Sequence, residues 1–203
     1  MKIIRAIVAG MLFVTLLLVT YYLHISFFNV NVVFYAAIAD GVFAAIITAA
    51  TLFSIGFFRA FGAFEKILLL VIFLLAGYSF AISVPTVIDR SLSFYILEKL
   101  QQRGGAIKQE SFEQVFTQEY VKEHRLVDVR LTEQLESGTI LIENGCVKLT
   151  EKGSAIASFG RYFRAHWLPK KRLLMGQYTD DLTAPFRSSV TTVDYRCGGN
   201  RPW

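Results

Sequence analysis

Long apolar runs fill the N-terminal part of the chain, and most polar positions lie after residue 88. Residues 6–23, 33–58 and 67–88 form three such runs. The first and third contain no charged residue, and the second contains only Asp40. Because a membrane-spanning helix needs about 20 mostly apolar residues, this pattern predicts three transmembrane helices.

After residue 88 the pattern changes to short amphipathic segments separated by turn residues. The predicted elements are helices over 91–103, 111–121 and 127–136, strands over 139–143 and 146–149, and a last helix running from Thr150 through Phe159. Ser91 and Thr150 are predicted N-caps, and Ser111 with Gln114 forms a capping-box pattern. Asn144-Gly145 is typical of a tight hairpin turn between the two strands.

The passage from Glu143 to Gly153 closely resembles the wing and last helix of winged-helix proteins of the MarR and PadR groups, in which an LT-x-x-G pattern follows the wing. The resemblance covers about residues 91–165. It implies a small α+β domain, so the predicted fold is a mainly α membrane protein with three transmembrane helices followed by a winged-helix-like domain. The predicted divisions are a transmembrane region over 1–88, this domain over 89–175 and a polar tail over 176–203.

DNA binding is not expected of this domain. In DNA-binding members of the class the third helix enters the major groove, and basic residues contact phosphates. The corresponding segment, 127–136, contains Arg130 against three acidic residues, and the wing offers Lys148 alone. The residues that carry DNA binding are therefore missing, and we expect the fold to serve protein interaction instead.

Composition supports a membrane location. Of the 203 residues, 54% are hydrophobic and 18% are charged, and the mean hydropathy is +0.45. An ordinary soluble domain has about 25% charged residues, so that class is excluded. The first apolar run is predicted to be retained, because it is long for a signal peptide and no small-residue cleavage site follows it.

The short loops predict the orientation in an inner (plasma) membrane. Lys2 and Arg5 precede the first span, and Arg59 and Lys66, with Glu65, lie between the second and third spans. The loop between the first two spans has no Lys or Arg. The positive-inside rule then places the N-terminus in the cytoplasm and the C-terminal domain outside it, in the periplasm of a bacterium. Cations that follow the third span argue against this placement.

The second span carries two further features. Ala37, Gly41, Ala45 and Ala49 repeat every four residues and form a ridge suited to close helix packing; the alternative is that alanine is simply common in such helices. Asp40 is costly at membrane depth. It either faces a bundle interior or partner, or reaches the membrane interface.

A basic and aromatic segment follows the predicted last helix. Its candidate membrane-contact residues are Arg161, Tyr162, Phe163, Arg164, Trp167, Lys170, Lys171 and Arg172. Cations and aromatic rings in one segment are typical of a surface that meets anionic lipid headgroups, with Leu173-Leu174-Met175 dipping into the lipid beside it. The alternatives are a solvated basic helix end and contact with an acidic protein.

The remaining chemistry is sparse. Cys146 and Cys197 are the only cysteines and are either a disulfide or two free thiols. No catalytic motif, nucleotide-binding glycine loop or metal-binding Cys/His spacing occurs in the sequence. We therefore predict no enzyme activity, cofactor or metal.

The leading hypothesis is a non-enzymatic accessory or scaffold subunit of an inner-membrane complex, in a setting such as envelope or glycolipid assembly. Its predicted partners are a larger integral membrane protein or a second copy bound through the second span, and anionic lipid headgroups. The alternatives are a membrane-bound winged-helix transcription regulator, and an enzyme or transporter that uses Asp40 or the pair Asp180 and Asp181.

Overall fold

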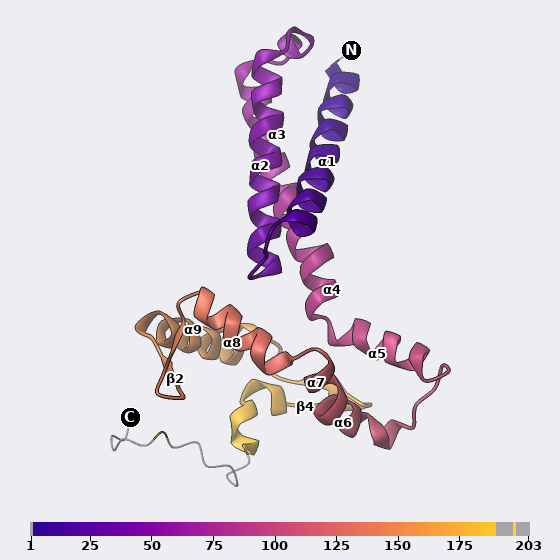
Figure 1. Cartoon of the computed structure of the whole chain (residues 1–203), viewed down its shortest axis with the longest axis vertical. Helices are drawn as coiled ribbons and strands as arrows, with labels where there is room; N and C mark the ends of the chain where they lie inside the picture. The colour runs from indigo at the N-terminus through magenta and orange to yellow at the C-terminus, as the bar shows by residue number, and fades with distance from the viewer. Residues whose placement is uncertain (1, 190–196, 198–203) are drawn as a thin grey trace. The chain divides into compact units, whose positions relative to one another are not determined.

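A computed structural model describes residues 2–189 and 197, and it is mainly helical. Its N-terminal part is a bundle of three long helices, α1 (Lys2–Phe27), α2 (Val33–Ser54) and α3 (Ala63–Ala81) (Figure 1). With the turns that continue α3 to Arg90, all three are long and apolar enough to cross a membrane. The sequence prediction of three such helices is confirmed.

Pro85 does not end the third helix. The chain continues from α3 through a π-helical turn, η2 (Ile82–Thr86), into α4 (Val87–Arg90). Proline lacks an N–H group and its ring crowds the preceding turn. A widened π turn inside a helix accommodates such a residue, so the apolar span runs from Ala63 to Arg90 without interruption.

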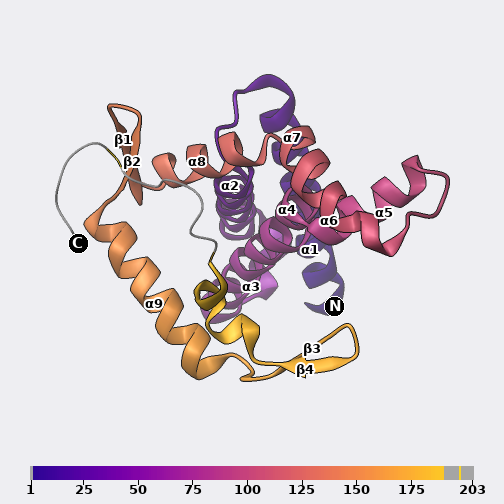
Figure 2. The same ribbon diagram turned by 90° about the horizontal axis from the view of Figure 1, so that it is seen from below.

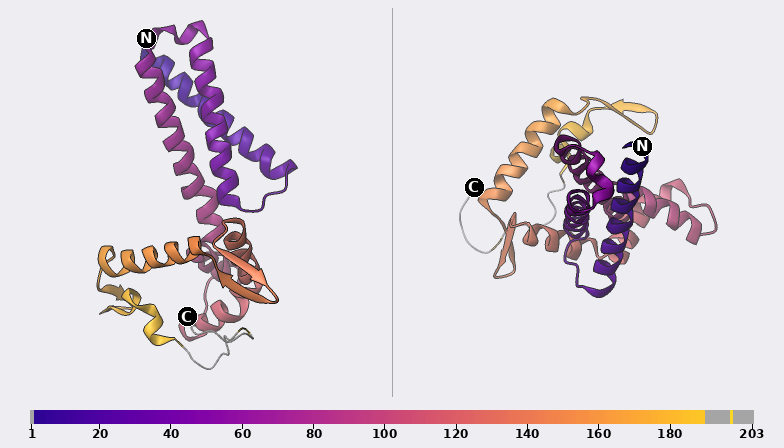
Figure 3. Two further views of the ribbon diagram at one scale, coloured as in Figure 1. Left: turned by 90° about the vertical axis from the view of Figure 1, so that its left-hand side faces the viewer. Right: turned by 90° about the horizontal axis from the view of Figure 1, so that it is seen from above.

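Small side chains and stacked rings hold the bundle together. Phe13 of α1 stacks on Phe73 of α3 with ring centroids 4.8 Å apart. Ala44, Ala45 and Leu52 of α2 are fully buried in the same cluster. In Figure 3, α2 and α3 run along each other and α1 is inclined to them. A short 3-10 helix, η1 (Gly56–Ala60), connects α2 to α3.

The helices of residues 91–129 follow the prediction only in part. Ser91 caps α5 (Leu92–Gln102) by accepting a hydrogen bond from the Phe94 N–H, as predicted. The predicted second helix is instead a series of short turns, η3 (Gln109–Ser111), α6 (Phe112–Gln114), π-helical η4 (Val115–Tyr120) and α7 (Val121–Glu123). Ser111 makes no capping hydrogen bond, so the expected capping box is wrong.

The chain divides into two compact units, Met1–Val129 and Arg130–Trp203, and α8 (Leu126–Glu136) crosses the boundary. In the second unit, β1 (Ile140–Glu143) pairs antiparallel with β2 (Cys146–Leu149). Asn144 and Gly145 both adopt positive φ at the turn, which confirms the predicted hairpin. The division into 1–88, 89–175 and 176–203 stays a prediction.

The last predicted helix is longer than expected. It is α9 (Glu151–Trp167), and a second hairpin follows, formed by β3 (Arg172–Leu174) and β4 (Gln177–Thr179) (Figure 2). Two 3-10 turns, η5 (Asp181–Thr183) and η6 (Pro185–Ser188), end the continuously described part. Within the region predicted as a polar tail, residues 177–179 form strand β4, and η5 follows it.

Candidate membrane-contact site

The LT-x-x-G passage fixes the start of α9. The Thr150 hydroxyl accepts a hydrogen bond from the Gly153 N–H at 3.1 Å and donates to the carbonyl oxygens of the 138–139 segment. A Cβ atom at Gly153 would overlap the Thr139 carbonyl oxygen and approach Leu149 Cδ1 to 2.9 Å. The glycine is therefore needed for the close contact between the helix and the first hairpin, and this contact sets the direction of α9.

One face of α9 is a stripe of exposed apolar side chains, which we call the aromatic face. Its members are Ile156, Phe159, Phe163 and Trp167. At 3.6 residues per turn these positions fall within roughly 80° of the helix circumference. Successive rings are in contact, with centroids 5.9 Å apart for Phe159 and Phe163 and 6.4 Å apart for Phe163 and Trp167. Phe159 is 65% exposed and Trp167 is 68% exposed.

The candidate cations are distributed unequally around this face. Helix geometry puts Arg164 at the border of the aromatic face and Arg161 on the opposite side. Lys170, Lys171 and Arg172 follow the helix end and are exposed. Four of the five predicted cations thus lie beside or beyond the aromatic face, and Arg161 does not.

Tyr162 packs with the helix end rather than with the aromatic face. Its ring stacks on His166 with centroids 4.3 Å apart, and its carbonyl oxygen lies 2.8 Å from His166 Nδ1. This contact ties the imidazole to the last turn of α9. Both rings border the aromatic face and widen its apolar surface.

The second hairpin adds a further exposed apolar surface. Leu173 pairs with Tyr178 across the two strands, and Met175 lies in the turn with positive φ. All three side chains are strongly exposed. A single two-stranded hairpin is marginally stable in water, which makes contact with an apolar surface favourable for these residues.

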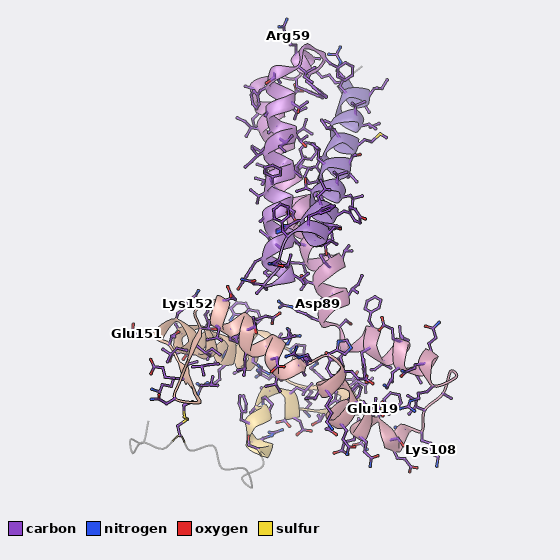
Figure 4. All side chains as sticks on the ribbon, viewed as in Figure 1. Arg59, Asp89, Lys108, Glu119, Glu151 and Lys152 are labelled. Carbon is purple, nitrogen blue, oxygen red and sulfur yellow. A yellow bond between two sulfur atoms is a disulfide. The ribbon has the colours of Figure 1, made fainter. Side chains whose placement is uncertain are left out.

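A disulfide joins Cys146 of β2 to Cys197, with Cα atoms 5.9 Å apart (Figure 4). The bond closes a covalent ring that includes α9 and the second hairpin. Of the two alternatives the sequence left open, the structure therefore has the pair. Disulfides persist in oxidising compartments outside the cytosol.

The small-residue ridge of α2 packs inside the bundle. Ala37, Gly41, Ala45 and Ala49 are all buried. A Cβ atom at Gly41 would lie 3.1 Å from Gly77 Cα of α3, so the two backbones are in direct contact. The ridge is thus used inside the three-helix bundle, with Gly41 on α3, and this face is not open to another protein.

Asp40 also turns into the bundle. It is 5% exposed, and its Oδ1 lies 2.9 Å from Nδ1 of His24 in α1. As the eighth residue of α2 it lies about 10 Å from the start of that helix. Of the two sequence alternatives, the bundle interior is the one seen. The pair links α1 to α2.

The carboxylates of Asp180 and Asp181 form ion pairs with one arginine. Arg187 contacts Asp180 at 2.7 Å and Asp181 at 2.8 Å. Its guanidinium holds the pKa of the Asp180 carboxyl below the usual range. The hydrogen bond from the Thr179 hydroxyl, and after it the Arg187 guanidinium, lowers the pKa of Asp181. This arrangement stabilises the turn after β4.

A second ion cluster stabilises residues 91–129. Lys99 is 4% exposed, and its Nζ lies 2.6 Å from oxygens of both Glu119 and Glu123. These hydrogen bonds raise the pKa of Lys99 and lower the pKa of each glutamate. Burial and the bond that its hydroxyl donates to Glu123 raise the pKa of Tyr95. The cluster joins α5 to the turns that follow it.

Among residues 2–189 and 197, no group of three or more His, Cys, Asp or Glu side chains is arranged to hold a metal ion. No family model, curated protein or solved structure matches the chain. The winged-helix interpretation therefore rests on the sequence pattern.

The sequence reasoning missed part of the aromatic face. Ile156 and Phe159 precede the basic segment; they lie in the predicted last helix and were not among the candidate membrane-contact residues. Their spacing with Phe163 and Trp167, at intervals of three and four residues, is the signal that would have found them. That signal becomes visible only when α9 is known to run to Trp167 rather than to end at Phe159.

Proposed function

We propose that this protein is a non-enzymatic accessory subunit of a larger assembly in an inner membrane. In this proposal the three-helix bundle is the anchor. The region after residue 88 is a winged-helix-like interaction module held close to the bilayer by α9. Anionic lipid headgroups and a larger integral membrane protein are its partners.

The aromatic face of α9 is the observation that carries this proposal. A row of contacting, exposed rings on one side of a helix is unfavourable in water and favourable at a membrane interface. Arg164, Lys170, Lys171 and Arg172 lie where a helix resting on that face would present them to lipid phosphates. Because the same chain is anchored in the bilayer, a membrane surface is the apolar partner available at the highest local concentration.

An extracytoplasmic location of the C-terminal region belongs to the same proposal. The disulfide between Cys146 and Cys197 supports it, as do the cations at the N-terminal end of the bundle. A phosphatase fused after Trp203 is expected to be active only on that side. A fluorescent cytoplasmic reporter at the same point is expected to stay dark. The opposite pair of results would refute this part and would favour a cytoplasmic regulator.

Trp167 offers a direct test of membrane contact. The sequence has two tryptophans, so Trp203→Phe leaves Trp167 as the only one. With the full chain in nanodiscs, lipids brominated near the headgroup should quench Trp167 strongly, and the quenching should be greatest in phosphatidylglycerol at low salt. Absence of quenching in every lipid would overturn the proposed contact.

A matched pair of variants tests the electrostatic part. Lys170→Gln with Lys171→Gln removes two cations beside α9, and Lys108→Gln with Lys122→Gln removes two exposed cations from residues 91–129. Each cation near an anionic surface contributes on the order of 1 kcal/mol. The first pair should weaken docking about 30-fold at low salt. The second pair should leave quenching unchanged, and equal effects would show that only net charge matters.

A further inference from the structure

A second cationic cluster lies at the end of the bundle where α1 begins and α2 connects to α3. Its members are Lys2, Arg5, Arg59 and Lys66; Arg59 marks this end in Figure 4. Glu65 is the acidic residue of this region, and Lys2 contacts it at 2.8 Å. Glu65 also accepts a hydrogen bond from the Gly62 N–H at the start of α3. The single carboxylate is therefore used by Lys2 and the helix cap.

Two of the other cations, Lys66 and Arg5, lie over ring faces rather than beside acids. Lys66 is 8% exposed, and its Nζ lies 4.9 Å from the centroid of Phe53. The guanidinium of Arg5 lies 5.2 Å from the centroid of Phe57. Among the described residues, no carboxylate is within ion-pair distance of Arg5, Arg59 or Lys66. A ring face attracts a cation but supplies no hydrogen-bond acceptor lone pair.

The ring under Arg5, Phe57, packs on the bundle core. Phe57 packs edge-on against Phe58 with centroids 5.0 Å apart, and Phe58 stacks on Phe61. Phe58 and Phe61 both belong to the buried core of the three helices. Arg5 and Phe57 therefore rest on a rigid support. Preorganised donors of this kind bind an anion at a low cost in side-chain entropy.

We propose that Arg5 and Lys66 bind the phosphate of an anionic phospholipid at this end of the bundle. Both side chains lie near the ends of helices that are apolar enough to span a membrane, which is the depth of lipid phosphates. Lys66 is buried without an acidic partner, and a buried ammonium is costly until an anion compensates it. A lipid supplies that anion together with acyl chains for the exposed apolar surfaces, such as Phe64. This inference is independent of α9 and of the orientation in the membrane.

Native mass spectrometry of the full chain in detergent tests the site. The wild type should retain one more molecule of phosphatidylglycerol than of phosphatidylcholine. Arg5→Gln with Lys66→Gln should weaken this retention about 30-fold, because two cations are lost. Arg5→Lys with Lys66→Arg keeps both charges and should retain the lipid, which separates loss of binding from loss of folding. The matched control, Lys108→Gln with Lys122→Gln, should retain it as well.

Two further measurements distinguish a lipid from free phosphate, and this site from the proposed membrane contact of α9. Excess inorganic phosphate should fail to displace phosphatidylglycerol; full displacement would mean that the site recognises free phosphate, and would overturn the lipid assignment. Lys170→Gln with Lys171→Gln should keep the retained lipid even where it abolishes quenching of Trp167. Equal retention of phosphatidylglycerol by the wild type and by Arg5→Gln with Lys66→Gln would refute the site and leave the role of α9 untouched.

Discussion

The contact between Gly41 and Gly77 makes the packing of α2 on α3 sensitive to a single methyl group. A Cβ atom at Gly41 would lie 3.1 Å from Gly77 Cα, and one at Gly77 would lie 3.0 Å from Gly41 Cα. The neighbouring backbone must move away to accommodate either atom, because no flexible side chain is available to yield. Within a bilayer, close backbone approach is itself a source of helix association, so this movement weakens the bundle directly.

The expected size of the effect follows from two opposing terms. Overpacking a well-packed interior by a methyl group costs about 1–3 kcal/mol. Exchanging glycine for alanine inside a helix returns up to about 1 kcal/mol through helix propensity, measured in water. Gly10→Ala is the matched control, because nothing lies within 4 Å of a Cβ atom at Gly10 of α1. The difference in unfolding free energy between Gly41→Ala and Gly10→Ala therefore isolates the overpacking cost.

Titration with sodium dodecyl sulfate measures this difference in the full chain. Dyes on Phe43→Cys of α2 and Leu75→Cys of α3, two exposed positions, report separation of the helices by loss of energy transfer. Gly41→Ala should open the bundle at a lower detergent fraction than Gly10→Ala, and Gly41→Leu at a much lower one. If the Gly41→Leu and Gly10→Leu bundles open at the same detergent fraction, the contact between Gly41 and Gly77 does not stabilise the bundle and the assigned packing is wrong.

Three further predictions concern the region after residue 90. Gly153→Ala should destabilise the second unit while Gly160→Ala, in the same helix with open space around it, should be neutral or stabilising, as judged by hydrogen exchange of β1 and β2; equal protection would contradict the close contact. The disulfide spans 51 residues and should stabilise the segment that it closes by up to ~4 kcal/mol through chain entropy. Reduction should therefore speed proteolysis within 150–189, whereas proteolysis of Cys146→Ser with Cys197→Ser should not change with reductant. Lys99 lowers the pKa of Glu119 and Glu123, so the ion cluster stabilises the fold above the usual carboxyl range and loses this effect as the pH falls through the lowered folded pKa values. Hydrogen-exchange protection factors of α5 in the wild type should therefore fall between pH ~6 and ~3. Lys99→Met should show lower protection at the higher pH and a flatter pH profile.

Local signals in the sequence predicted much of this fold. The three spans follow from uninterrupted apolar runs, which satisfy the length of a bilayer without any tertiary contact. Asn144-Gly145 predicted the first hairpin because both residues tolerate the positive φ that the turn requires. Ser91 and Thr150 marked helix starts because their hydroxyls accept from the first free N–H groups.

The features that escaped prediction depend on contacts between distant segments. Proline disfavours helix in the residue before it, but the third span continues through Pro85 in a π turn. The partner of Asp40 is His24, sixteen residues away on another helix, and no periodicity reveals that pairing. Lys66 counted only as a loop cation for orientation, whereas its burial over Phe53 is a tertiary property.

Burial of the ridge changes where a membrane partner has to bind. Because Gly41 packs on Gly77 of the same chain, another helix is left with outward faces of α2 such as Val42, Phe43 and Ile46. Bulky side chains keep backbones apart and gain little over lipid contact, since acyl chains are equally apolar. Tight association of α2 with a helix of another protein inside the bilayer is therefore not expected. For the proposed accessory subunit, specific contacts would lie mainly outside the hydrocarbon region, in the module that follows Arg90 and that we propose is held at the surface by the aromatic face of α9.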